Sequence, residues 1–302
     1  MPGPESTNPP APVSASVTAA GGRPDNQDRC GDGPTAAGHV WIVADGLGGH
    51  AAGELAADCA VAAVLRALAE RPALGPGEIE RAFGAARDGI RALQRERPAA
   101  RGCRTTAVVL AIEGGRALWG HVGDSRLYHL RGGRVLDQTL DHSVPQALVQ
   151  AGVLAADAVR HHPDRNRLLR SIGGDEPVEV ALLGSPVGVE AGDAFLLCSD
   201  GFWELVDEAE MERSLAEAHD AADWLRRMEA ALLAGATGAF DNYTATAVLL
   251  RDAAASGAPR ARGLGALATR LRGRLGGAPR LRRGARLHSA PDPPGPRTGT
   301  AG

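Results

Sequence analysis

Short apolar runs bounded by glycine and polar residues occupy two stretches of the chain, and longer amphipathic stretches lie between and after them. The run 40–44 has the length and composition of a buried strand. Four more strand-like runs follow one another at 105–113, 116–122, 125–130 and 134–137. Gly114-Gly115 and Gly132-Gly133 supply the positive φ that hairpin turns need. The pattern predicts a β-meander there, and later strands at 194–199 and 244–250.

Three stretches have the apolar spacing of amphipathic helices, at 55–69, 79–96 and 221–233. Pro72 and Pro98 end the first two, because proline cannot continue a helix. We expect these two helices to form an antiparallel pair that covers one face of a sheet. Helices that are segregated from a meander predict an α+β domain rather than a doubly wound parallel sheet.

The remaining segments lack a clean period. Residues 142–175 are polar and contain Pro145 and Pro163, which predicts a surface segment near a site, such as a flap. Residues 1–16 are rich in Pro, Ser and Ala and are expected to be a disordered lead-in. The predicted organisation is therefore a lead-in at 1–16, one domain at 17–252 and a tail at 253–302 rich in Arg, Ala, Gly and Pro.

Charge is divided unequally along the 302 residues. Ten of the 33 basic residues, all of them Arg, and only one of the 36 acidic residues lie in the tail. The acidic remainder argues against a nucleic-acid-binding core and fits a cation-binding function. Two interpretations of the tail stay open. It is either a solvated disordered segment or a basic helix that contacts an acidic partner or an anionic membrane surface.

Composition and leader signals favour a cytoplasmic protein. Hydrophobic residues make up 44% and charged residues 23% of the chain, as in soluble globular proteins. The four cysteines share no CxxC spacing, and the N-terminus lacks the basic start and apolar centre of a signal peptide. No window approaches the apolar length of a membrane span.

Four aspartates stand where apolar runs begin or end: Asp45, Asp124, Asp200 and Asp241. Carboxylates that converge to about 4 Å repel one another by about 4 kcal/mol per pair at an effective dielectric of 20, so they stay ionised together only around a cation. Oxygen ligands without a His or Cys cluster favour Mg²⁺ or Mn²⁺ over zinc. The sequence therefore predicts a site for hard divalent ions.

Two such ions can activate a bridging water for in-line attack on a phosphoryl group. A phosphate also needs a cationic clamp, and Arg23 lies five residues before another possible ligand, Asp28. Acyl transfer is disfavoured because no GxSxG motif is present, although Ser125 and Ser199 neighbour aspartates. No GxxxxGK[ST] loop is present either.

Taken in order, these motifs resemble those of the metal-dependent PP2C (PPM) Ser/Thr protein phosphatases, and the bacterial branch most closely. The matching segments cover about residues 17–251 and are Gly22-Arg23-(x4)-Asp28, Asp45-Gly-Leu-Gly-Gly-His50, Gly102 to Thr106, Gly120-His-Val-Gly-Asp-Ser-Arg126, Asp141-His142-Ser143, the stretch from His162 to Gly173, Ser199-Asp-Gly201 and Asp241-Asn242. The resemblance implies a four-layer αββα sandwich of two antiparallel sheets flanked by helices.

The resemblance also implies roles for individual residues. Asp45 would bridge two Mn²⁺ or Mg²⁺ ions, and Asp200 and Asp241 would complete the shell of the first. The Gly46 carbonyl and, through water, Asp28 would serve the second ion. Asp124, with Asp200, would hold a weaker third ion. Arg23 would bind the substrate phosphate, and Asn242 would orient Asp241 or a bound water.

Two positions depart from the family pattern. Gln27 stands where the family usually has Glu, which removes one charge near the second ion. Leu47 stands where some eukaryotic members have a His proposed as general acid, so protonation of the leaving alkoxide would fall to metal-bound water. Bacterial members commonly share the second departure, which therefore does not indicate inactivation.

The resemblance implies hydrolysis of phosphoserine and phosphothreonine in proteins, opposing Ser/Thr kinases. Phosphorylated proteins, including the kinases or their substrates, would be its partners, and the chain is expected to be a monomer. Two alternatives stay open. One is an inactive phosphatase fold that binds phosphoproteins, and the other is a phosphatase of small phosphoesters.

Structural roles are favoured for several residues: His50 as a cap or packing residue, His121 as a core histidine, and Trp203 and Trp224 as core aromatics. Substrate contact by His161 or His162 is not favoured.

Overall fold

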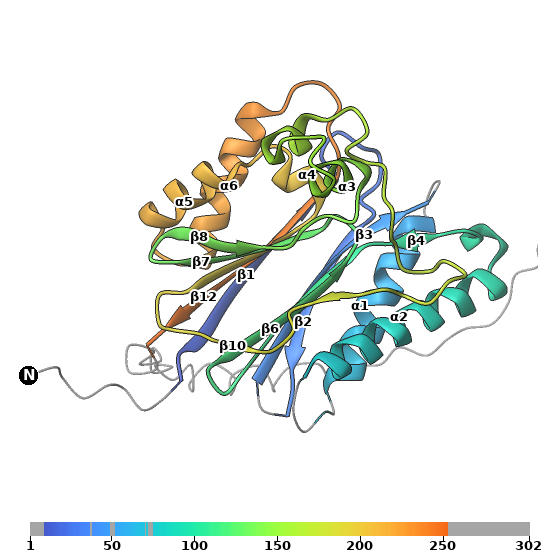
Figure 1. Ribbon diagram of the computed structural model, residues 1–302, viewed down its shortest axis with the longest axis horizontal. Coiled ribbons are helices and arrows are strands. Elements are labelled where there is room, and N and C mark those ends of the chain that lie inside the picture. The colour runs from blue at the N-terminus through green and yellow to red at the C-terminus, as the bar shows by residue number, and fades with distance from the viewer. Residues whose placement is uncertain (1–8, 37, 49–51, 70, 72–74, 253–302) are drawn as a thin grey trace, which may run out of the picture. The chain divides into compact units, whose positions relative to one another are not determined.

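Two antiparallel sheets stack face to face, and helices cover the outer face of each (Figure 1). The computed structural model describes residues 9–252 except 37, 49–51, 70 and 72–74. The tail at 253–302, together with both interpretations of it, lies outside the described residues, as does His50. Among the described residues, no helix has the length and apolar character needed to cross a bilayer.

The first sheet has the strand order β1-β12-β11-β7-β8, and each neighbouring pair is antiparallel. Its strands are β1 (Ala11–Ala19), β7 (Arg126–Arg131), β8 (Arg134–Gln138), β11 (Ala194–Cys198) and β12 (Tyr243–Arg251). The two chain-terminal strands of the domain, β1 and β12, lie side by side over nine residue pairs.

The second sheet has the order β10-β6-β5-β3-β2, with β4 pairing with β3 and β9 pairing with β6. Its strands are β2 (Asp28–Pro34), β3 (Gly38–Leu47), β4 (Arg104–Thr105), β5 (Ala107–Glu113), β6 (Arg116–Val122), β9 (Ala181–Leu182) and β10 (Val187–Gly188). The α+β class and the antiparallel sandwich expected from the sequence are confirmed.

Helices pack on each outer face. The helices α1 (Ala52–Ala69) and α2 (Pro76–Glu96) pack against each other and cover the second sheet, as predicted. The helices α4 (Asp200–Trp203), α5 (Glu208–Glu217) and α6 (Ala221–Gly235) cover the first sheet. The polar segment predicted at 142–175 contains α3 (Val144–Gln150) and the 3₁₀ turn η2 (Ala156–His161). A further 3₁₀ turn, η1 (Pro98–Ala100), follows α2.

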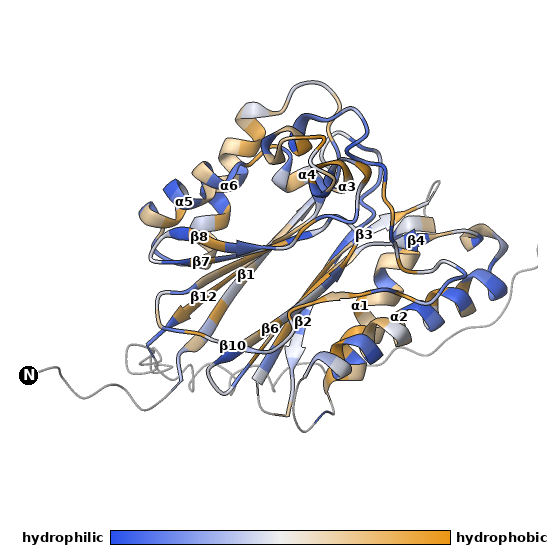
Figure 2. Cartoon of the chain, in the orientation of Figure 1, coloured by the Kyte–Doolittle hydropathy of each residue, from blue (hydrophilic) through white to orange (hydrophobic). Residues whose placement is uncertain are grey.

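The layers follow from the alternation of side chains along each strand. In β3, Val40 and Ile42 face the core under α1 and α2, whereas Trp41 and Val43 face the core between the sheets. Strand β11 divides its buried side chains in the same way between its helices and the other sheet. Both sheets are therefore apolar on both faces, and the inner strands are mostly hydrophobic in Figure 2. Trp203 and Trp224 are buried core aromatics, as predicted.

One sequence-based interpretation of the strands is wrong in its pairing. The four runs at 105–137 do not form a single meander, because β5 and β6 belong to one sheet and β7 and β8 to the other. The chain changes sheets between Val122 and Arg126, and Gly123 there has φ +102°. A Cβ at Gly123 would lie 2.5 Å from the Thr106 side chain, so the crossing requires glycine.

The expected disorder of residues 1–16 is also wrong from Ala11 onward. Residues 11–19 form β1, which pairs with β12 along its whole length. Small and β-branched residues tolerate the half-exposed edge of the sheet, and Pro12 is compatible with an edge strand because its missing N–H can face away from the ladder. The domain therefore begins several residues earlier than position 17.

A buried ion pair anchors the segment that follows β8. Arg126 donates from Nε and Nη2 to the two carboxylate oxygens of Asp141, each at 2.8 Å, and both side chains are almost fully buried. The guanidinium carbon lies 3.5 Å from the ring centroid of Trp203, whose indole N–H donates to the Asp124 carbonyl oxygen at 2.9 Å. Arg126 thereby connects the root of residues 142–175 to the loop that carries Asp124.

We predict that Asp141→Ala lowers the free energy of unfolding by about 3–5 kcal/mol, because it removes the bidentate partner of the buried Arg126 guanidinium and leaves it only the Glu208 carboxylate, 3.9 Å away. Asp164→Ala removes an exposed, long ion pair with Arg167 and should cost less than about 1 kcal/mol. Urea unfolding of the two variants measures the difference. Equal losses would contradict an anchoring role for the buried pair.

Candidate metal centre

The loops at one end of the sandwich bring together all the acidic residues singled out in the sequence. Asp45 lies near the end of β3, and Asp28 begins β2 directly opposite it in the antiparallel pairing. Asp124 lies in the crossing between β6 and β7, Asp200 is the first residue of α4 after β11, and Asp241 precedes β12. Because these strand ends share one edge of the two sheets, rigid elements hold the carboxylates.

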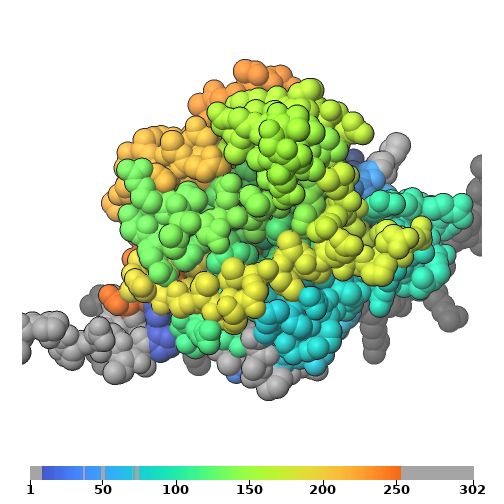
Figure 3. Space-filling view, in the orientation of Figure 1, coloured from blue at the N-terminus to red at the C-terminus, as the bar shows by residue number. Residues whose placement is uncertain are grey.

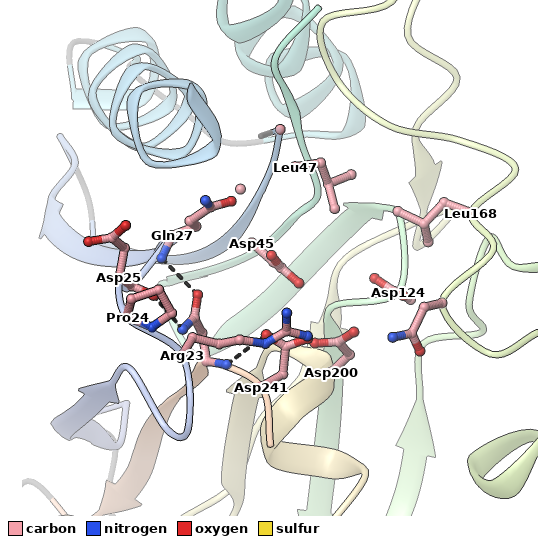
Figure 4. Close-up of a pocket in the computed structure, with 14 residues that line it drawn as sticks. Arg23, Pro24, Asp25, Gln27, Asp45, Leu47, Asp124, Leu168, Asp200 and Asp241 are labelled. Carbon is pink, nitrogen blue, oxygen red and sulfur yellow. Dashed lines mark hydrogen bonds and ion pairs between the residues drawn. The ribbon is translucent and has the colours of Figure 1, made fainter. Parts of the chain in front are cut away.

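A pocket of about 550 Å³ opens between these loops (Figure 4). Four of the aspartates line it, and their carboxylates lie around one space in the close-up. The residues that line it are Arg23, Pro24, Asp25, Gln27, Asp45, Gly46, Leu47, Gly48, Asp124, Asn166, Leu168, Asp200, Asp241 and Asn242. Asn166 and Leu168 come from the 142–175 segment, which therefore forms one wall of the pocket.

Arg23 and Asp241 form an ion pair at the mouth of the pocket. The guanidinium donates from Nη2 to Asp241 Oδ2 at 2.8 Å, and the Arg23 side chain keeps 54% of its surface exposed. Arg23 is therefore paired with one of the expected metal ligands. Its guanidinium group lies beside the carboxylates, where a phosphate would bind.

Asn242 holds the loop that carries Arg23. Its side-chain oxygen accepts from the Gln27 N–H at 2.8 Å, and its amide donates to the carbonyl oxygens of Ala20 and Asp25 at 2.9 and 2.8 Å. Only its backbone N–H donates to Asp241 Oδ1, at 2.8 Å. The side chain thus positions the β1–β2 loop, and the orientation of Asp241 comes from the backbone.

Buried hydroxyl groups fix the backbone of Asp45. Thr106 Oγ1 accepts from the Asp45 N–H at 3.2 Å, and Thr105 Oγ1 donates to the Asp45 carbonyl oxygen at 2.7 Å. Thr106 Oγ1 also shares a hydrogen bond with Ser125 Oγ at 2.7 Å. Ser125 and Ser199 are completely buried, which agrees with the absence of a serine nucleophile.

Gly46 and Gly53 approach each other closely at the start of α1. A Cβ at Gly53 would lie 2.2 Å from Gln27 Oε1 and 2.5 Å from the Gly46 carbonyl oxygen. A Cβ at Gly46 would lie 2.2 Å from the Gly53 carbonyl oxygen. The Gln27 amide oxygen and the Gly46 carbonyl oxygen therefore lie beside the same α-carbon, close to each other, as ligands of one cation would.

Two buried carboxylate oxygens of the cluster lack a hydrogen-bond partner among the described residues, Asp28 Oδ1 and Asp124 Oδ1, and Glu210 Oε1 on α5 is a third outside the cluster. Asp28 does not line the pocket. Its Oδ2 accepts from Ser199 Oγ at 2.6 Å, and Ser199 Oγ accepts in turn from the Thr244 N–H at 2.9 Å. A buried acceptor without a donor is costly, and a cation or an ordered water would satisfy it.

Burial and mutual repulsion raise the pKa of these carboxyl groups. Burial raises the pKa of Asp28 to about 6 and, with help from the Asp141 charge, that of Asp124 to about 7. The pKa values of Asp45 and Asp200 lie well above the usual 3.8, because burial is reinforced by the other aspartates. Without a cation, the cluster therefore favours binding protons over carrying its full negative charge.

Within the described part of the chain, no group of three or more His, Cys, Asp or Glu side chains is arranged to hold a metal ion by itself. The carboxylates share a pocket without closing into a coordination shell. Their repulsion, and the attachment of Asp241 to Arg23, account for this spacing. The all-oxygen donor set, the two unpartnered carboxylate oxygens and the Gly46–Gln27 pair nevertheless fit hard divalent ions.

His121 occupies the core position that was predicted for it. His121 is buried, contacts the Leu140 carbonyl oxygen through Nε2 at 2.8 Å and stacks on His142. His161 and His162 do not line the pocket. Leu47 lines it at the position where a general acid stands in some relatives of the motif.

Sequence reasoning did not identify the supporting hydroxyls Thr105, Thr106, Ser125 and Ser199 as positioning groups. Ser125 and Ser199 neighbour aspartates in the sequence, whereas Thr105 and Thr106 do not, and the aspartates that Thr105, Thr106 and Ser199 contact lie in distant segments. The amide contacts of Asn242 with residues 20–27 were likewise not predicted.

The sequence matches the family model of protein phosphatase 2C over residues 20–234. It is 33% identical over 206 residues to the serine/threonine protein phosphatase PstP of Mycobacterium tuberculosis, which covers 68% of this chain and 39% of PstP. It is 31% identical over 235 residues to the protein phosphatase PhpP of Streptococcus pneumoniae, covering 76% of this chain and 94% of PhpP.

Solved structures have a similar fold. The catalytic domain of PstP in complex with two manganese ions superposes with a TM-score of 0.68 and is 30% identical, covering 80% of this chain and 99% of that domain.

We predict that the metal-free chain loses stability as the pH rises from about 4 to 7. Asp28 and Asp124 titrate at about 6 and 7 in the folded state and near 3.8 when unfolded, so the folded state binds more protons across this range. Each unit of difference corresponds to about 1.4 kcal/mol. Urea unfolding in EDTA should show the decline, and Asp124→Asn should reduce its slope. If the dependence of the unfolding free energy on pH is unchanged in that variant, Asp124 is not a buried carboxylate with a raised pKa.

We also predict that Gln27→Glu tightens the binding of one Mn²⁺ ion by roughly tenfold, because it adds a carboxylate beside the Gly46 carbonyl oxygen, and ligand charge sets affinity for hard cations. Isothermal titration calorimetry with Mn²⁺ measures the effect. Gln150→Glu, at an exposed glutamine at the end of α3, is the matched control. If Gln27→Glu and the wild type bind Mn²⁺ with the same affinity, residue 27 does not contact the ion.

Proposed function

Because the chain belongs to the protein phosphatase 2C family, we propose that it hydrolyses phosphoserine and phosphothreonine in proteins, in a reaction that depends on two Mn²⁺ or Mg²⁺ ions. One observation carries the proposal. Four loops from both sheets bring Asp45, Asp124, Asp200 and Asp241 to one pocket, with Arg23 at its mouth.

The proposed ligands divide into three groups. Asp45, Asp200 and Asp241 would hold the first ion, and Asp45 would also serve the second. The Gly46 carbonyl oxygen and, through water, Asp28 would serve the second ion, where Gln27 would supply a neutral oxygen. Asp124, whose Oδ1 lacks a partner among the described residues, would form a weaker third site with Asp200. When bound, the cations activate water for in-line attack on phosphorus and withdraw charge from the phosphate oxygens.

Arg23 is proposed to bind the substrate phosphate. Its guanidinium now donates to Asp241, and it becomes available to two phosphate oxygens once Asp241 serves as a ligand. Asn242 keeps the Arg23 loop at a fixed distance from Asp241 through its three side-chain hydrogen bonds. The cation and the ligands are therefore positioned before the substrate arrives, which lowers the entropic cost of the reaction.

Phosphorylated proteins are the substrates of this family, and the open pocket suits a phosphorylated side chain on a larger chain. Opposition to particular kinases, a monomeric state and contacts of the tail stay predictions. An inactive phosphoprotein-binding module is disfavoured because all five proposed carboxylate ligands are present. A phosphatase of small phosphoesters would use the same pocket and is separated by the choice of substrate.

We predict that the purified chain hydrolyses p-nitrophenyl phosphate and a phosphothreonine peptide with Mn²⁺ and that EDTA abolishes both activities. Asp200→Asn should lower kcat by at least about a hundredfold, because it removes a charged ligand of the bound ions. Arg23→Ala should raise KM for the peptide by roughly tenfold, through the loss of a bidentate phosphate contact.

The matched control is Asp88→Asn, an exposed carboxylate on α2, which should keep wild-type rates. Phosphopeptide binding without turnover in the presence of Mn²⁺ would instead indicate the binding module. Cleavage of p-nitrophenyl phosphate but of no phosphopeptide would indicate a small-molecule phosphatase.

A further inference from the structure

Four exposed arginines follow one another from the end of α2 to β4: Arg95, Arg97, Arg101 and Arg104. We call these four residues the basic ridge. Glu96 is the single acidic residue between positions 92 and 104. The tight turns of η1, with Arg101 N–H bonded to the Pro98 carbonyl oxygen, keep the four residues within a short path.

The basic ridge lacks counter-ions of its own. Within the described residues, none of its four guanidinium groups takes part in a hydrogen bond or an ion pair. One turn earlier on α2 the situation is different, since Arg87 and Arg91 bind the backbone and the carboxylate of Asp175 at 2.6 and 2.5 Å. Residues 1–252 contain 35 acidic residues against 23 arginines, so acids to pair with are abundant. Four neighbouring cations without such partners repel one another and favour an external anion.

The ridge begins at the mouth of the metal pocket. Arg104 on β4 lies opposite Leu47 in the pairing with β3, and Leu47 lines the pocket. Arg104 also lines an adjoining cavity of about 460 Å³, and Leu168 lines both spaces. We call these two cavities, which share Leu168, the groove; the carboxylates line one part of it and Arg104 lines the other.

The position of the ridge is fixed by the core. Gln94 Nε2 donates to the carbonyl oxygens of Cys103 and Gly173, at 2.7 and 3.0 Å, and so connects the end of α2, the turn before β4 and the segment at 173. In Figure 3 the teal surface of α2 borders the yellow surface of the segment that follows residue 170. The cations are thus held on a rigid surface beside the groove.

We propose that the basic ridge binds an acidic stretch of the phosphoprotein substrate, so that the enzyme prefers phosphorylated residues with Asp or Glu a few positions away. The proposal rests on the proposed phosphatase function and adds a substrate preference to it. An extended chain advances about 3.3 Å per residue, so a peptide whose phosphate lies at Arg23 reaches Arg104 within several residues. Three acidic residues also line the adjoining cavity, Asp175, Glu176 and Glu179. Asp175 pairs with Arg91 and Glu179 with Arg170, so Glu176 is the acid of this cavity that opposes the charge of the ridge.

The test compares phosphothreonine peptides that share one core and carry either four Glu or four Gln, on the N-terminal or on the C-terminal side. The wild type should cleave one Glu peptide with a kcat/KM about tenfold above its Gln counterpart, mainly through KM, since several exposed ion pairs each contribute a small factor. The preference should fade in 0.5 M NaCl because salt screens exposed charges.

Variants locate the effect. Arg101→Ala/Arg104→Ala should reduce the Glu-to-Gln ratio to about one, and Arg101→Glu/Arg104→Glu should invert it. Arg101→Lys/Arg104→Lys should retain most of it, because charge is kept. Arg66→Ala, an exposed arginine near the end of α1, is the matched control and should keep the full ratio. Thermal unfolding of each variant confirms that it folds.

Every rate is divided by that of the same variant on p-nitrophenyl phosphate, which carries no peptide. A chain that fails on p-nitrophenyl phosphate would refute the proposed function, whereas a chain that cleaves all the peptides equally would refute only the role of the ridge. A preference that survives Arg101→Ala/Arg104→Ala overturns the proposal too. The proposal is also overturned if the ridge is required for binding to phosphatidylserine vesicles while the enzyme shows no preference among the peptides.

Discussion

The repulsion among carboxylates held at one end of the sandwich is the constraint on which the rest of the site depends. Asp28, Asp124 and Asp200 are buried, and Asp45 is half-buried, so water screens their charges poorly. The fold tolerates this because the carboxylates lie at the ends of strands whose apolar side chains are buried in the cores, β3, β11 and β12. The packing free energy of the cores between and outside the sheets offsets the repulsion that would otherwise push the carboxylates apart. Bound cations would relieve that repulsion.

Neutral side chains organise this charged end. Thr105 and Thr106 hold the backbone of Asp45, Ser199 holds Asp28, and Trp203 holds the carbonyl of Asp124. Each of these contacts joins segments that lie 60 or more residues apart in the sequence. The fold is therefore the scaffold of the site, because the groups that orient each ligand come from distant parts of the chain.

Much of this could be predicted from the sequence. The three longest helices and most of the longer strands followed from periodicity and glycine positions, whereas α3, α4 and α5 did not. The Asp-Gly pairs after apolar runs indicated the pocket that now contains Asp45 and Asp200. The division of residues 105–137 between two sheets could not be predicted, since the hairpin signals at Gly114 and Gly132 are the same in one sheet or two. Strand β1 was missed because small residues at a sheet edge have a weak pattern, and its stability comes from pairing with β12 at the other end of the domain. The place of Asp28, turned toward Ser199 rather than the pocket, depends on contacts across 171 residues that no local pattern reports.

The side-chain amide of Asn242 has a consequence for the chemical ageing of the protein. Its NH₂ group faces two carbonyl oxygens and its oxygen faces an N–H, so every polar atom matches the polarity of its neighbour. Deamidation to aspartate would preserve the shape and reverse one half of this pattern, setting a carboxylate oxygen against two carbonyls. A change of one mass unit would then loosen a side chain that, together with the Arg23–Asp241 ion pair, holds the guanidinium loop beside the carboxylates. Deamidation at this residue would therefore disturb the site before it disturbs the sandwich.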